Sequence, residues 1–510
     1  MSKQVLLWVA ASLFAASANA QDIIEAYNLS GTSVQGTARS IGFGNALGSI
    51  GGDFSSLSVN PAGIGVYRTS ELSFSPSLKL NYATSTFQGK VVDDNNAHIN
   101  LNQFGVIFTE APKGRRYDHR NWKAISFGIG MNRISDFNRD YNYTGINTTG
   151  SASLLFEADA NRNPYDLDNA GTLRNMGVDA GLLTPHLSSY YSTVPFAGGI
   201  TQANTVSERG GINEYVATLG GNYKERLMLG ATIAIPVMDY HRTSDYSETV
   251  LPGNTANTYN FSTFTYHNQL NISGTGFNAK LGAILKLTNF LRIGAAFHTP
   301  TVYSIQEHTE YGISSVVDNV NHTLSTNYSL PVSSFDYSFI TPYKGVLSAS
   351  LVIKKLGFIT ADYEIVDYST MKYIYPDGID ASTGISFRQE QTDMNNAIKN
   401  NYQAASNIRL GAEIKLTKFL MVRGGVGYYG NPYKTGTSAA HTNISAGIGF
   451  HTKNFFADLG VVNTSWTFRE QAYSDVDYNY VATPNTGAPA PIATIQPTTN
   501  NASLTLGLKF

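Results

Sequence analysis

The sequence contains no cysteine among its 510 residues. It can therefore form neither a disulfide framework nor a thiolate zinc site, and no thiol is present to carry a lipid anchor. Charge is also scarce, because Asp, Glu, Lys and Arg make up only 14% of the chain, and 35 basic residues stand against 37 acidic ones. A nearly neutral chain of this kind does not favour binding to nucleic acid.

Motifs of metal and nucleophile chemistry are missing as well. The ten histidines lack HxxxH or HExxH spacing, and no GxSxG elbow appears. GVGYYG at 425–430 matches a dinucleotide-binding pattern, but Asn431-Pro432 follows where a helix should begin. EADANRN at 157–163 has Arg162 where a calcium loop needs glycine. We therefore expect no metal, no cofactor and no enzymatic activity.

Long apolar runs are absent after the first twenty residues. Lys3, the apolar stretch 5–16 and Ala18-Asn19-Ala20 follow one another in the order of a cleaved secretory signal. The stretch is shorter than the roughly 20 residues that a membrane helix needs. We expect residues 1–20 to be a signal peptide and the mature chain to begin at Gln21.

What the chain has instead is strict alternation of apolar and polar residues. Residues 280–298 and 407–428 each show it on both sides of a short turn, and the last ten residues show it without a break. A soluble sandwich strand could share this pattern, but a barrel strand in lipid requires an apolar outer face and a polar face toward a wet lumen. In the last strand the apolar face consists of Leu504, Leu506, Leu508 and Phe510.

The alternation predicts an all-β fold, a transmembrane antiparallel β-barrel of about 14 strands over residues 70–510. Short turns alternate with long polar connections, as is typical of periplasmic turns and extracellular loops. The connection at 110–121 is an exception, because it is longer and basic. The long loops are expected at 136–212, 242–273, 306–341, 371–404 and 469–499.

Residues 21–69 precede the first strand and need a place in the structure. An even number of strands leaves both ends of the barrel in the periplasm, and about 14 strands enclose a lumen wider than wall side chains can fill. We expect residues 21–69, which are rich in glycine and small side chains, to form a plug, or hatch, inside the lumen.

Within this segment, GFGNALGSIGGDFSSLSVNPAGIGVY carries Asn60-Pro61-Ala62 just before the first strand. Asn-Pro alone is a turn signal. Together with the preceding GNA and DFSS elements, the motif resembles the FadL/TodX-type family of outer-membrane transporters for long-chain fatty acids and other hydrophobic compounds. GFNAKLGAILKLTNFLRIGAAFH is similar to the strand-turn-strand style of that family.

The resemblance implies a monomeric barrel in the bacterial outer membrane that takes up a hydrophobic small molecule by loop capture, hatch passage and lateral release. Its other partners would be outer-membrane lipid, lipopolysaccharide and the barrel-insertion machinery, which would read the terminal Phe510. A kink in the third strand is where such transporters release ligand. On that basis Gly128 and Gly130 are candidates for the lateral exit, and close contact with the hatch is the alternative reading of the two glycines.

Candidate ligand-binding residues fall into two sets. Apolar clusters within the loop at 136–212 could build a capture groove or pack the loop onto the barrel rim, and inward-facing arginines could meet a carboxylate or pair with other lumenal charges. The candidates are Leu154, Leu155, Phe156, Leu182, Leu183, Tyr190, Tyr191, Phe196, Arg292, Arg409 and Arg423. A general porin and a docking partner in protein secretion remain alternative functions.

Overall fold

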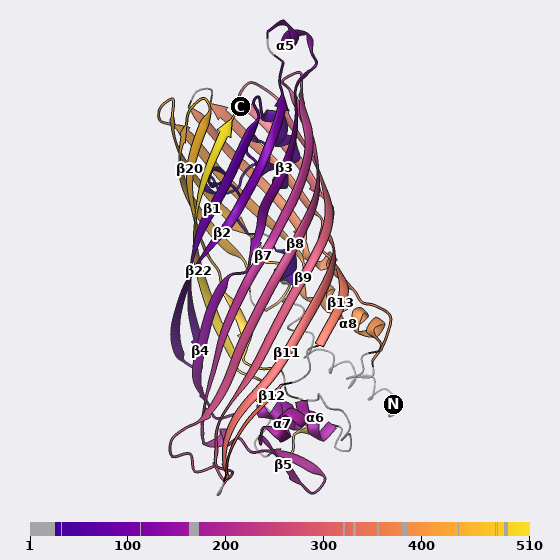
Figure 1. Ribbon diagram of the computed structural model, residues 1–510, viewed down its shortest axis with the longest axis vertical. Helices are drawn as coiled ribbons and strands as arrows, with labels where there is room; N and C mark the ends of the chain where they lie inside the picture. Colours follow the sequence, from indigo (N-terminus) through magenta and orange to yellow (C-terminus); the bar gives the residue numbers. More distant parts are fainter. Residues whose placement is uncertain are drawn as a thin grey trace.

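The computed structural model describes residues 26–510 except 32, 113, 163–172, 320–321, 330–332, 354–355, 380–384, 437, 475, 477 and 484–487. The expected signal peptide lies outside the described residues. The wall is one antiparallel sheet that closes where β1 pairs with β22 (Figure 1). Its strands are β1 (Glu71–Phe87), β2 (Lys90–Glu110), β3 (Trp122–Asp136), β4 (Arg139–Asn147), β7 (Ile200–Tyr223), β8 (Leu227–Val250), β9 (Phe261–Lys286), β10 (Leu291–His298), β11 (Val302–Asn319), β13 (Ser333–Ile340), β14 (Lys344–Ile353), β15 (Gly357–Asp367), β16 (Lys372–Ile374), β17 (Ala404–Lys415), β18 (Leu420–Tyr429), β19 (His441–His451), β20 (Phe455–Ser465) and β22 (Ile492–Lys509).

Helices and short strands fill the lumen and the connections. The first group, inside the barrel, comprises α3 (Ala38–Gly42), α4 (Ser56–Val59) and the 3-10 helix η1 (Pro61–Val66). The connections contain α5 (Arg115–His119), α6 (Ser153–Arg162), α7 (Leu173–Asp179), β5 (Leu183–His186), β6 (Ser189–Ser192), η2 (Phe196–Gly198), β12 (His322–Ser329), η3 (Tyr368–Thr370), α8 (Phe387–Asn401), β21 (Phe468–Gln471) and η4 (Tyr478–Tyr480).

The barrel has fourteen strands, as the alternation predicts. Five of them are interrupted within the described residues. β3 and β4 share β7 as a partner, β10 and β11 share β9, and β20 and β21 share β22. In the same way, β13 continues β14 and β15 continues β16 across a break. Pro300 and Pro342 stand in two of these breaks. Proline has no N–H to donate to a ladder, so the strand must pause there.

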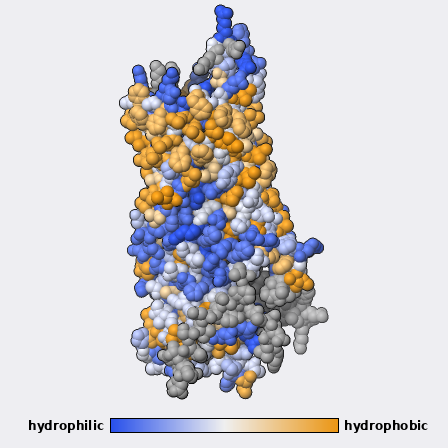
Figure 2. Space-filling view, viewed as in Figure 1, coloured by the Kyte–Doolittle hydropathy of each residue, from blue (hydrophilic) through white to orange (hydrophobic). Residues whose placement is uncertain are grey.

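The outer surface carries an apolar band on one half of the barrel (Figure 2). In β22, Leu504, Leu506 and Leu508 are exposed on this band, whereas Ser503 and Thr505 are buried on the lumenal side. None of the described helices is long and apolar enough to cross a bilayer. The band and the closed sheet are the architecture of an outer-membrane β-barrel.

The strands continue well past the band at the end opposite the chain's C-terminus (Figure 1). β7 and β8 have 24 residues each and β9 has 26. The loop limits predicted at 136–212, 242–273 and 306–341 are therefore wrong, because much of each is strand. Outside lipid a strand can be polar on both faces, so alternation fades while the ladder continues. The loop at 371–404 contains β16 and α8, and that at 469–499 contains β21 and the start of β22.

Residues 26–67, called here the lumenal segment, lie inside the barrel. Their backbone lies directly against inward-facing glycines of many wall strands. A Cβ atom at any of five of these glycines would come within 2.2 Å of the segment. The five are Gly230, Gly282, Gly294, Gly411 and Gly460, from β8, β9, β10, β17 and β20. Missing side chains in the wall thus make room for the segment.

Candidate functional site

The Asn60-Pro61-Ala62 motif joins the lumenal segment to the wall. Asn60 is fully buried, and its side-chain oxygen accepts a hydrogen bond from the Ala62 N–H at 3.1 Å, which caps η1. Its amide nitrogen donates to the carbonyl oxygen of Gly48 at 2.6 Å and, at 3.3 Å, to that of Ala283 in β9. Pro61 occupies the first position of η1, where its fixed φ suits the helix and its missing N–H costs nothing.

The wall is closed at the two glycines proposed for lateral exit. β2 and β3 pair without a break from Gln103–Asn132 to Glu110–Ile125, a stretch that includes Gly128 and Gly130. A Cβ at Gly128 would lie 2.9 Å from Leu57, and one at Gly130 would lie 2.6 Å from Phe54. The placement of the exit at these glycines is therefore corrected, because both positions accommodate close contact with the lumenal segment.

A discontinuity lies just beyond this ladder, toward the extracellular end. Residues 90–102 of β2 have ladder partners only in β1 among the described residues, and the pairing of β3 with β7 shifts between Arg133 and Ser135. Such a bulge at Ile134 bends the strand. We call the boundary between β2 residues 90–102 and residues 133–147 of β3 and β4 the seam.

Side chains, rather than backbone pairing, hold the seam together. The Asn100 amide donates to Asp136 at 2.6 Å, and the Asn138 amide donates to Asn100 at 3.3 Å. Asp136 also accepts hydrogen bonds from Lys79 at 2.7 Å and from Arg133 at 3.1 Å. Side-chain rotation can exchange these contacts one at a time, each worth about 1–3 kcal/mol, whereas opening a strand ladder requires the two backbones to separate and several bonds to break together.

A cavity of about 120 Å³ lies in the lumen beside the seam. Asn132, Arg133 and Ile134 line one side of it. The start of the lumenal segment also lines the cavity, and there the Ser33 N–H donates to the Ile134 carbonyl oxygen at 3.0 Å. The segment thus contacts both the cavity and the bulge.

The same stretch is held at its other end by aromatic rings. Residues 26–30 are helical, and the Tyr27 ring lies 5.2 Å from that of Tyr368, edge to face, and 6.4 Å from that of Tyr402, stacked. The Tyr433 ring is 6.0 Å away. Among the described residues, the Tyr27 hydroxyl makes no hydrogen bond, so ring contacts hold this side chain. We call the space between Tyr368, Tyr402 and Tyr433 the tyrosine notch.

The apolar residues proposed for a capture groove are packed in a closed core at the extracellular end. Leu154 and Leu182 are fully buried, and the core also includes Phe264 of β9 and Ile313 of β11. The groove is therefore corrected to packing of the loop onto the barrel rim. The other proposed members are the buried Phe156, Leu183 and Phe196 and the partly buried Leu155, Tyr190 and Tyr191.

Buried polar contacts hold this core on the strands. Glu248 of β8 is fully buried and accepts hydrogen bonds from the Ala152 N–H at 2.8 Å and from the Ser151 hydroxyl, next to the start of α6. Burial raises the pKa of Glu248 above its usual value. The extracellular core is thus coupled to the charge state of one carboxyl group.

Two of the three proposed arginines are ion-paired. Arg423 contacts Glu413 at 2.8 Å and Asp458 at 2.6 Å. Arg409 contacts Glu364 at 3.3 Å. Arg292 has no carboxylate partner among the described residues and donates to the Ile50 carbonyl oxygen at 3.3 Å. It lines a second cavity, of about 300 Å³, nearer the periplasmic end.

Several residues of this region were missed from the sequence. Tyr27 and its three partners lie far apart along the chain, and Ile134 is an ordinary strand residue in the sequence. The abundance of tyrosine, 31 residues, was the available signal, but it does not say which rings meet.

Comparison with known proteins agrees with this architecture. A FadL homologue of Pseudomonas aeruginosa has a TM-score of 0.55 at 10% identity, over 94% of this chain and 99% of that one. The toluene transporter TodX of Pseudomonas putida has a TM-score of 0.49 at 12% identity, over 94% and 99%. The CymD monoaromatic hydrocarbon channel has a TM-score of 0.46 at 12% identity, over 92% and 98%. No protein-family model and no curated protein matches the sequence.

The likeness to the FadL homologue shows the fold. The chain has the FadL-type barrel fold that its Asn60-Pro61-Ala62 motif suggested.

Proposed function

We propose that this barrel carries hydrophobic small molecules passively across the bacterial outer membrane and releases them sideways through the seam. The observation that carries the proposal is the seam itself, where, within the described residues, β2 residues 90–102 have no ladder partner in β3 or β4, next to a lumenal cavity. The resemblance of Asn60-Pro61-Ala62 and its surroundings to FadL/TodX-type transporters supports this substrate class, and the chain shares the fold of the FadL homologue.

Lateral release answers a physical difficulty of such transport. Placing a long apolar chain in periplasmic water costs about 0.8 kcal/mol per methylene, or roughly 10 kcal/mol for twelve methylenes. A ligand that leaves through the wall passes from the lumen into lipid and avoids this cost. Seam side chains such as Asn100 and Asn138 would exchange partners as it passes.

The lumenal segment supplies the gate in this proposal. Withdrawal of Tyr27 from the tyrosine notch would free the stretch that contacts the cavity and would release the Ile134 carbonyl from Ser33. Ring contacts of this kind are worth about 0.5–1.5 kcal/mol each beyond burial, so a ligand that fills the notch can compete with them.

Cross-linking tests the route. The chain has no native cysteine, so introduced thiols act alone. Cysteines at Asn100 and Asn138, whose side chains are 3.3 Å apart, can be joined by a short bis-methanethiosulfonate linker, which forms a reducible disulfide with each thiol, releases methanesulfinate and so ties the seam. The matched control places cysteines at Val106 and Ile129, which already face each other across the β2–β3 ladder.

We expect the seam cross-link to abolish uptake of a hydrophobic probe into reconstituted vesicles, with reductive cleavage restoring it. The ladder cross-link should leave uptake unchanged. Full uptake with a quantitatively linked seam would refute lateral release here and favour exit into the periplasm.

A general porin is the main alternative, and bilayer conductance separates the two functions. The lumenal segment contacts wall strands on many sides, including β8, β10, β17 and β20. We therefore expect single-channel conductance far below that of an open barrel of this strand number. Steady, open conductance would favour the porin.

A further inference from the structure

Three short turns at the periplasmic end share one construction. In Thr288-Asn289-Phe290 and Thr417-Lys418-Phe419, the threonine hydroxyl accepts hydrogen bonds from two backbone N–H groups at 3.0–3.3 Å. The donors are the residues two and three positions after the threonine. Thr452 accepts one from Phe455 at 3.1 Å in the third turn, which contains Lys453. Each turn thereby holds a phenylalanine next to a lysine or an asparagine.

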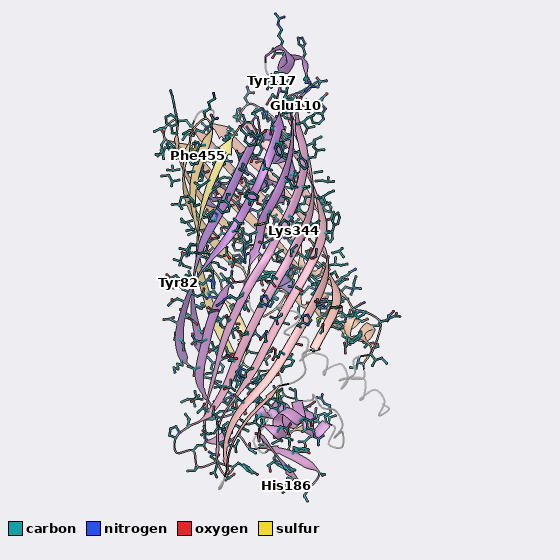
Figure 3. All side chains as sticks on the ribbon, in the orientation of Figure 1. Tyr82, Glu110, Tyr117, His186, Lys344 and Phe455 are labelled. Carbon is teal, nitrogen blue, oxygen red and sulfur yellow. The ribbon has the colours of Figure 1, made fainter. Side chains whose placement is uncertain are left out.

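The phenylalanines face the lipid side of the barrel. Phe290, Phe419 and Phe455 are 58%, 52% and 38% exposed and adjoin the apolar band. Phe455 lies at the same end as Glu110 and Tyr117, opposite His186 (Figure 3). These turns therefore lie where the lipid headgroups of the periplasmic leaflet begin, because aromatic side chains mark both interfaces of such barrels.

Uncompensated positive charge gathers at this end. Lys418 and Lys453 are exposed and make no ion pair within the described part of the chain. The described short turns at 224–226, 287–290, 416–419 and 452–454 contain one acidic residue, Glu225. It is already neutralised by Arg68 at 2.8 Å and Lys286 at 3.0 Å.

We propose that the turns of Lys418 and Lys453 bind the phosphate groups of anionic phospholipids in the periplasmic leaflet. Each lysine would hold a headgroup while the neighbouring Phe419 or Phe455 anchors the turn among the acyl chains. Charge complementarity identifies the partner, and contact with the lipid-facing band identifies its source. The Asn289 turn has the same frame without the charge and gives the design of a conservative variant.

The test uses the full chain in nanodiscs that contain equal amounts of phosphatidylglycerol and phosphatidylcholine. Lipids retained by the protein are counted by native mass spectrometry for the wild type and for Lys418→Asn/Lys453→Asn, which copies Asn289. Lys90→Asn/Lys399→Asn is the control, because both of these lysines are exposed at the extracellular half. Each sample is also measured with added inorganic phosphate.

We expect the wild type to prefer phosphatidylglycerol and the turn variant to lose roughly fivefold of that preference per lysine. The control should keep it, and inorganic phosphate should not compete. Undiminished preference in the turn variant, an equal loss in the control, or displacement by inorganic phosphate would each overturn the proposal. Uptake should be unchanged in the turn variant, so this result is independent of the transport route.

Discussion

Replacing Asn60 with alanine measures how far this one side chain holds the lumenal segment in its fold against the wall. The substitution removes two short hydrogen bonds, one donated to Gly48 and one accepted from Ala62. It also removes two longer ones, to Ala283 at 3.3 Å and Ala295 at 3.4 Å, which connect the segment to β9 and β10. The barrel ladders themselves lose nothing.

The expected size of the effect follows from these contacts. A hydrogen bond contributes about 1 kcal/mol, and a buried group left without a partner costs about 1–3 kcal/mol. Counting only the two short bonds of the buried Asn60, which both lie within the segment, the local fold of the segment around Gly48 and Ala62 weakens by about 3 kcal/mol, which raises the population of locally opened states roughly 100-fold.

Amide hydrogen exchange, read by mass spectrometry, measures that population directly. Exchange of residues 48–67 should rise strongly in Asn60→Ala, while exchange in β9 and β10 stays slow. Asn454→Ala, in an exposed turn, is the control and should match the wild type. A rise of less than about threefold in residues 48–67 would refute the reasoning, because Asn60 would then contribute little to the local fold of the segment.

Three further predictions concern folding and the extracellular core. Gly282→Ala should lower the heat-modifiable folded fraction, because its Cβ would lie 1.9 Å from Asn60. Gly424→Ala is the control and should leave the fraction unchanged, because its Cβ would meet no atom within 4 Å. Equal fractions for the two variants would contradict close packing of the segment against the wall. Deletion of Phe510, which is 65% exposed at the end of the closing strand, should reduce the folded yield in outer membranes, and an unchanged yield would remove its assembly role. An acid whose pKa is raised by burial stabilises the fold most when protonated, so protection of the α6 amides should be highest below about pH 4.5 and fall as the pH rises through the raised pKa of Glu248. Glu248→Gln should abolish that dependence, and its persistence in the variant would assign it elsewhere.

The local alternation of apolar and polar residues by itself determined most of the barrel. The i, i+2 alternation of residues such as Leu504, Leu506 and Leu508 follows from the two faces of a strand, one in lipid and one in the lumen, and it needs no knowledge of partners. The strand number and the closing strand followed from counting these segments. The limits of the strands outside lipid did not, because there the solvent is the same on both faces.

Much less of the candidate site could be predicted from the sequence. Asn60-Pro61-Ala62 was found because its residues are consecutive. The apolar clusters at Leu154 and Leu182 were recognised as buried surface in need of a partner, but the sequence left open whether that partner was a ligand or the barrel rim. The structure shows the rim, since β9 and β11 supply the facing side chains.

Only tertiary structure brought Tyr27 to Tyr402 and placed the seam beyond Gly128. Alternation fixes which face a residue occupies, but not which residue lies opposite it across the lumen. That second relation depends on the register of every strand around the closed wall and on the path of the lumenal segment through it. The sequence therefore predicts which face of a strand each residue occupies, whereas contacts across the lumen, such as that of Tyr27 with Tyr402, are fixed only when the barrel closes.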